Sequence, residues 1–91
     1  MTPITTCEEF EAALEHGPYT SVGSYPIYFV TANSDVLSYQ AARDNMAEVI
    51  EAFSSDDPEW RVIGFEINWE SELYCEHTGE PIEAAYEIVR N

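Results

Sequence analysis

An alternating run of residues, Trp60 to Glu70 (WRVIGFEINWE), constrains the fold of this chain more than any other feature. Successive side chains of an extended segment point to opposite faces, so alternation over this length predicts a long, half-buried strand. One face would be wholly apolar: Ile63, Phe65, Ile67 and Trp69. The other face would be mixed and at least partly wet: Val62, Gly64, Glu66, Asn68 and Glu70.

A second strand is predicted from Pro26 to Thr31 (PIYFVT), where β-forming residues are apolar at nearly every position. Such a run is typical of a strand that is covered on both faces. Residues 18–25 (PYTSVGSY) are predicted to form a loop before this strand, and Asn33 to Asp35 a turn after it.

Two helices are predicted from capping signals and periodicity. Thr6 and Glu9 have the spacing of a capping box, and Gly17-Pro18 ends the helix that follows. The clearest helix is predicted from Ser38 to Phe53, and the segment 54–58 (SSDDP) ends it. Its apolar stripe has helical spacing: Tyr39, Ala42, Met46, Val49, Ile50 and Phe53.

Two structures are compatible with the last part of the chain. In a hairpin, residues 73–75 would form one arm, Gly79 would supply the positive φ of the turn, and the return would start at Ile82. The favoured alternative is a short strand, the same turn and then a helix from Pro81 to Val89. The element order predicts one α+β domain spanning residues 1–91, with a small, mainly antiparallel sheet of three to four strands covered by two or three helices.

The charge of the chain is its most unusual property. There are 18 acidic residues against three Arg and no Lys, and the net charge is −15. Such a chain should be repelled by nucleic acid and by anionic membranes, and attracted to the basic surfaces with which other proteins hold nucleic acid. The plain alternative is a solvated surface that keeps the protein soluble, as in a protein from a salt-loving host.

The acids form rows in the predicted elements. Carboxylates one helical turn apart are spaced by roughly 5–6 Å, and DNA carries one negative charge per about 1.7 Å of its axis. Rows of this kind could therefore imitate phosphates. The candidate partner-binding residues are Glu8, Glu11, Glu15, Asp44, Glu48, Glu51, Glu66, Glu70, Glu72, Glu76, Glu80, Glu83 and Glu87.

Catalytic and metal sites find little support. Cys75 and His77 are separated by one residue, whereas zinc ligand pairs are usually separated by two to four. A dyad of Cys7 or Cys75 with His16 or His77 would need a positive environment to lower the thiol pKa, and the negative field is expected to raise it. Carboxylate pairs are too abundant to be specific, and no phosphate-binding Gly motif is present. We therefore predict a binding protein with no catalytic residue, metal or cofactor.

The segments YPIYFVT, SYQAARDN, WRVIGFEINWE and LYCEHTGEPIEAAY resemble a group of small acidic proteins encoded by bacteriophages and prophages. Such proteins include anti-CRISPR proteins, which block the DNA-recruiting complex or the nuclease, and DNA mimics that inhibit restriction enzymes. The resemblance implies a counter-defence binding protein without catalytic residues. Within this group we favour an anti-CRISPR inhibitor that binds a basic surface of a type I complex (Cascade), and we expect a monomer. The resemblance carries no residue with an assigned role.

Two further expectations follow from the residues. The N-terminal sequence MTPITTCEEFEA lacks the basic and apolar regions of a signal peptide. We therefore expect the protein to lie in the cytoplasm of a bacterial host, where the thiols of Cys7 and Cys75 would be reduced. Alternatives to the inhibitor are a phage accessory or structural protein that docks on a basic partner, and a small hydrolase that uses Cys75 or a carboxylate pair.

Overall fold

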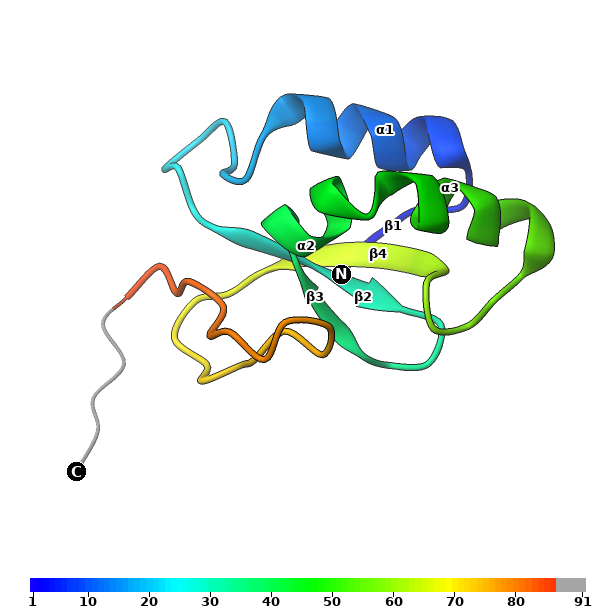
Figure 1. Cartoon of the computed structure of the whole chain (residues 1–91). Helices are drawn as coiled ribbons and strands as arrows, with labels where there is room; N and C mark the ends of the chain where they lie inside the picture. Colours follow the sequence, from blue (N-terminus) through cyan, green and yellow to red (C-terminus); the bar gives the residue numbers. More distant parts are fainter. Residues whose placement is uncertain (87–91) are drawn as a thin grey trace.

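The computed structural model describes residues 1–86, which form one antiparallel sheet with helices on one face (Figure 1). The strand order is β1-β4-β2-β3. The strands are β1 (Thr2–Pro3), β2 (Ile27–Thr31), β3 (Val36–Ser38) and β4 (Val62–Ile67). The helices are α1 (Cys7–His16), α2 (Tyr39–Asp44) and α3 (Met46–Ser55). The predicted α+β class, with a small antiparallel sheet and two or three helices, is confirmed.

Phe29 of β2 lies at the centre of the core and is fully buried. Its ring centroid is 5.4 Å from that of Phe10 in α1 and 6.4 Å from that of Tyr39 in α2. Phe65 is its direct partner in β4, so the two side chains share one face of the sheet. Phe10 also contacts Phe53 of α3, with ring centroids 6.2 Å apart. All three helices therefore cover the face of the sheet that carries Phe29.

The first predicted helix is confirmed in detail. The Glu9 amide donates to the Thr6 hydroxyl and the Thr6 amide donates to the Glu9 carboxylate, both at 3.2 Å, which completes the capping box. Hydrogen bonds from the Thr5 hydroxyl and amide, then from Thr6, hold the pKa of Glu9 below its ordinary value. Phe10 and Leu14 are buried, and Gly17 follows the helix with a φ of 105°.

The single helix predicted from Ser38 to Phe53 is wrong in two respects. Ser38 belongs to β3, a strand that was not predicted, and it caps α2 by accepting from the Ala41 amide at 3.0 Å. Asn45 interrupts the helix with a φ of −113°. Its side-chain amide donates to the Ala41 carbonyl at 2.9 Å, a local bond that competes with helical geometry. Five residues of the predicted apolar stripe pack in or against the core, but Met46 is 43% exposed, so the prediction is wrong for that residue.

The two central strands also differ from their predictions. The strand expected from Trp60 to Glu70 is limited to β4, and its register shifts between Val30 and Thr31 of β2. This irregularity skips Ile63 and pairs Thr31 with Val62, and both of these residues are fully buried. The prediction that β2 is covered on both faces is wrong, because the helices cover one face only and its alternate residues are half-buried on the other.

The helix predicted from Pro81 to Val89 is wrong for residues 81–86, and residues 87–89 lie outside the described part of the chain. Pro81 instead forms an isolated β-bridge with Tyr74. The Cys75 amide donates to the Glu80 carbonyl at 2.8 Å, and Gly79 has a φ of 74°. The hairpin alternative therefore describes this segment, because the Ile82 amide donates across the turn to the Leu73 carbonyl at 2.8 Å and not to a carbonyl one helical turn earlier.

Residues 73–82, called the hairpin segment below, also cover the outer edge of β3. The Glu76 amide donates to the Val36 carbonyl at 2.8 Å, and the Ser38 amide donates to the Cys75 sulfur at 3.4 Å. The opposite edge of the sheet is β1, which has only two residues and includes Pro3. Both edges of the sheet are therefore short or covered.

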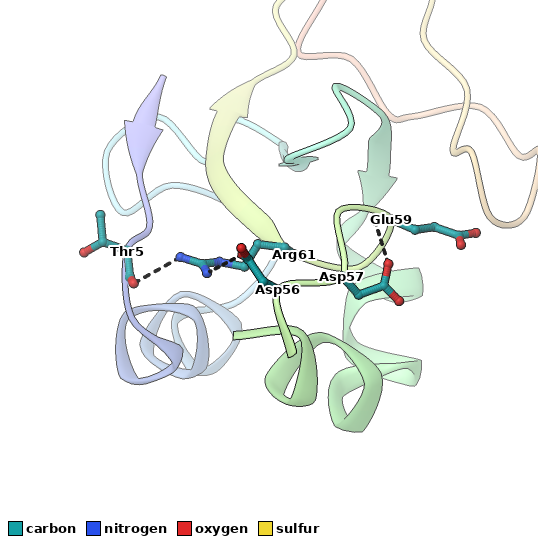
Figure 2. Close-up of polar contacts among 5 residues, drawn as sticks. All are labelled: Thr5, Asp56, Asp57, Glu59 and Arg61. Carbon is teal, nitrogen blue, oxygen red and sulfur yellow. Dashed lines mark hydrogen bonds and ion pairs between the residues drawn. The ribbon is translucent and has the colours of Figure 1, made fainter. Parts of the chain in front are cut away.

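Arg61 joins three segments at one end of the core (Figure 2). Its guanidinium carbon lies 4.5 Å from the ring centroid of Phe53, and its side chain is 22% exposed. It donates to the Thr5 carbonyl at 3.4 Å and lies 3.6 Å from the Asp56 carboxylate (Figure 2). The start of α1, the end of α3 and the start of β4 are thereby tied to one cation.

We expect Arg61→Met to lower the free energy of unfolding by about 1–2 kcal/mol, because it removes a cation–aromatic contact and charged hydrogen bonds. Arg43→Met is the matched control, since Arg43 is exposed and its replacement changes the net charge equally. Urea denaturation measures both. Equal losses in the two variants would show that Arg61 acts through net charge alone.

Candidate functional site

The described candidate acids are exposed, except for Glu66, which is half-buried. Glu87 lies outside the described residues. The acids do not form one continuous surface. One set is on the helices: Glu8, Glu11, Glu15, Asp44, Glu48 and Glu51. A second set is on the hairpin segment and the turns beside it: Glu70, Glu72, Glu76, Glu80 and Glu83.

The helical set gathers on the layer that covers the sheet. α1 and α3 lie side by side, joined by the contact of Phe10 with Phe53 (Figure 1). A hollow of about 720 Å³ beside α1 is lined by Glu11 and Glu15 and by Ile50 of α3. The structure therefore brings the acids of α1 close to α3, although these helices are about 40 residues apart in the sequence.

The remaining acids lie elsewhere. The Tyr28 hydroxyl donates to Glu66 at 3.1 Å, and the N-terminal ammonium lies 3.5 Å from the same carboxylate. Because Tyr28 and Glu66 are direct partners next to the pair of Phe29 and Phe65, they point to the sheet face without helices. The hairpin segment lies below the sheet in Figure 1, away from α1 and α3. There the Tyr19 hydroxyl donates to Glu83 at 2.9 Å.

Both cysteines are free, and their surroundings differ. Burial, followed by the hydrogen bond and the charge of Glu8, raises the pKa of Cys7. Burial also raises the pKa of Cys75, but hydrogen bonds to its sulfur from the Ser38 amide, the Thr78 side chain and the amides of Thr78 and His77 together lower that pKa below its ordinary value. The negative charge of Glu8 and Glu11 thus contributes to the raised pKa of Cys7, behind burial. The expectation that the negative field raises the thiol pKa is wrong at Cys75, where short-range donors dominate.

We expect Thr78→Val, in a Cys7→Ala background, to raise the pKa of Cys75 by removing a donor to the sulfur. A folded pKa below the unfolded value stabilises the protein above the unfolded pKa, and this stability is lost as the pH falls through the folded pKa. As the pH rises from the folded pKa of Cys75 to its unfolded pKa, the free energy of unfolding should therefore increase less in the variant than in the Cys7→Ala parent. Thiolate absorbance at 240 nm and urea denaturation measure the two effects. Thr78→Ser keeps a hydroxyl and is the control; identical titrations of all three proteins would contradict the assignment.

The described part of the chain does not gather metal-binding side chains. Among residues 1–86, no three side chains of His, Cys, Asp or Glu are placed to hold a metal ion. Cys75 is 1% exposed, whereas the His77 ring packs edge-on against Trp60 with centroids 5.0 Å apart. In the same part of the chain, no helix has the length and apolar character needed to cross a membrane.

The sequence reasoning missed an apolar hollow on the other flank of α1. It has a volume of about 400 Å³, and its lining includes Ala12 and Ala13 of α1 with Ile27 and Phe65 of the sheet. The adjacent alanines were a weak signal, because small side chains on a helix flank leave room above a sheet.

Comparisons with models of protein families, with curated proteins and with solved structures found no match to this chain, so its function is argued from its own residues.

Proposed function

We propose that this protein inhibits a bacterial defence complex by binding its basic, nucleic-acid-binding surface, with a type I CRISPR complex as the favoured target. It would act as a monomer in the host cytoplasm and carry out no chemical step. Its carboxylates would occupy positions that DNA phosphates take, and target DNA would then be excluded. The acids of the helical layer are the observation that carries this proposal.

These acids are exposed, and Arg43 is the cation that lines a hollow together with Glu11 and Glu15. None of the helical set forms an ion pair within the described part of the chain, where ion pairs are made by Glu66 and Asp56. Glu8, Glu11 and Glu15 follow one another at spacings of three and four residues, which places their carboxylates about one helical turn apart. Negative charge held this close destabilises the compact state. A basic partner would relieve that repulsion, which makes the surface suited to binding.

The resemblance to small acidic phage proteins supports a defence complex as the partner. It does not separate that partner from a basic capsid or packaging component. Charge pairing at an exposed surface is screened over about 10 Å at 0.1 M salt. Binding by this surface should therefore weaken steeply as salt is added, whichever basic partner is present.

The test uses a purified type I CRISPR complex and fluorescent target DNA. We expect the protein at stoichiometric amounts to prevent DNA binding in 0.1 M NaCl, and to be less effective in 0.5 M NaCl. A basic protein that does not bind DNA, such as cytochrome c, controls for unspecific attraction. Unchanged DNA binding at a hundredfold excess would overturn the CRISPR assignment. A plaque assay in cells carrying one CRISPR system at a time provides the cellular counterpart.

A further inference from the structure

The apolar hollow beside α1 borders the proposed binding surface, and the acid that lines it is Glu9. Ala12 is exposed on α1 and lines the hollow. Glu8 lies four residues before Ala12 and Glu15 three residues after it, so both are its neighbours on the helix surface. A side chain that enters the hollow at Ala12 therefore has a carboxylate about one turn away on either side.

The floor of the hollow is formed by the sheet. Ile27 and Phe65 line it from β2 and β4. A second hollow of about 430 Å³ begins at Thr20 and Phe65, which line both, and reaches Trp69. Trp69 is 45% exposed. Apolar side chains therefore extend from Ala12 to Trp69, beside the polar Thr2, Thr20 and Glu66 of the second hollow.

The charged side chains around the two hollows are acidic, and the N-terminal ammonium of Met1, which also lines the second hollow, lies 3.5 Å from the Glu66 carboxylate. Glu9 lines the first and Glu66 the second, and no Lys or Arg side chain lines either one. His16 borders the first hollow, where its Nε2 atom is 2.6 Å from the Ser21 hydroxyl. Arg43 lines the hollows on the other flank of α1 and between α2 and the hairpin segment. An apolar group next to positive charge is therefore the complementary ligand here.

We infer that this hollow is the anchor point of the partner, and that it takes one apolar side chain from a partner segment in which Lys or Arg residues flank that side chain. The inference rests on the proposed function and specifies where binding is centred. The apolar side chain would contact Ile27 and Phe65, and the flanking cations would pair with Glu8 and Glu15. Interfaces commonly combine a buried anchor with surrounding charge in this way.

The experiment uses two labelled peptides of twelve residues as probes. Both contain only Lys, Arg and Gly around one central position, which is Phe in the first peptide and Ala in the second. We expect fluorescence anisotropy to show that the Phe peptide binds at least about tenfold more tightly, the gain typical of burying one large apolar side chain. In ¹H–¹⁵N spectra of the protein, the amide signals of Ala12, Ala13, Thr20 and Phe65 should shift with the Phe peptide and much less with the Ala peptide.

A pair of matched variants sharpens the test. Ala12→Trp fills the hollow and should remove the preference for the Phe peptide. Ala47→Trp adds the same side chain at another exposed helical alanine, on α3 away from the hollow, and should keep the preference. The comparison of peptides on the unaltered protein needs no variant, so it decides the question even if Ala12→Trp fails to fold.

The outcomes separate the inference from the proposed function. Equal binding of both peptides, weakened by salt, would overturn the anchor and leave the acidic surface as the binding site. Binding of neither peptide in low salt would contradict both proposals. Sedimentation that reveals a dimer, lost in Ala12→Trp, would assign the hollow to a second copy of this chain and overturn the inference.

Discussion

Replacing Glu8, Glu11 and Glu15 together by Lys should abolish inhibition, with binding to the basic partner weakened by more than about a hundredfold. Like charges placed opposite one another in an interface cost several kcal/mol, and this variant would set three Lys against a basic surface. α1 should still form, because Phe10 and Leu14 keep its buried face and Thr6 keeps its cap. The measurement is competition with target DNA on the purified type I complex.

The matched control reverses Glu70, Glu76 and Glu80, which are exposed and lie away from the helices. Its net charge equals that of the α1 variant, so a loss caused by total charge would appear equally in both. We expect the control to inhibit nearly as well as the original protein. Full inhibition by the α1 variant, with the helix intact by circular dichroism, would refute mimicry by α1.

Phe10→Ala should lower the free energy of unfolding by about 3–5 kcal/mol, the usual loss when a buried Phe is truncated. Phe10 is fully buried and its ring contacts Phe29 and Phe53, so its removal opens a space where α1, α3 and β2 meet. Domains of this size have a total stability of roughly 5–14 kcal/mol. The variant should therefore be partly unfolded well below the melting temperature of the parent protein.

Urea denaturation followed by circular dichroism measures this loss. Val22→Ala provides the control, because Val22 is 84% exposed and lies in the loop before β2, where truncation should change stability by less than about 0.5 kcal/mol. A loss below about 1 kcal/mol in Phe10→Ala would mean that the three elements repack without this ring, contrary to the core described above.

The predictions succeeded where structure depends on neighbours in the chain. The capping box of Thr6 and Glu9 involves residues three apart, and the turn at Gly79 depends on one residue without a β-carbon. They failed where a distant partner decides. The strand that ends at Ser38 exists because Ser38 pairs with Tyr28, and Pro81 pairs with Tyr74 and does not start a helix.

The candidate site was predictable to a similar degree. Exposure of the acids could be inferred from their chemistry, because unpaired carboxylates are costly to bury. Which acids share a surface could not be inferred, since α1 and α3 are brought together by long-range packing such as that of Phe10 on Phe53. The hollow beside Ala12 was not evident either, because its floor comes from two strands that are distant in the sequence from α1 and from each other.

The closed edges of the sheet have a consequence for behaviour at high concentration. A free strand edge is a template on which a second molecule can add, and such addition leads to fibres. Here the hairpin segment occupies the edge of β3, and β1 is too short to offer a useful template. Concentrated salt would screen the repulsion between copies. The chain should nevertheless resist fibrillation under those conditions, because its resistance comes from backbone groups that are already occupied.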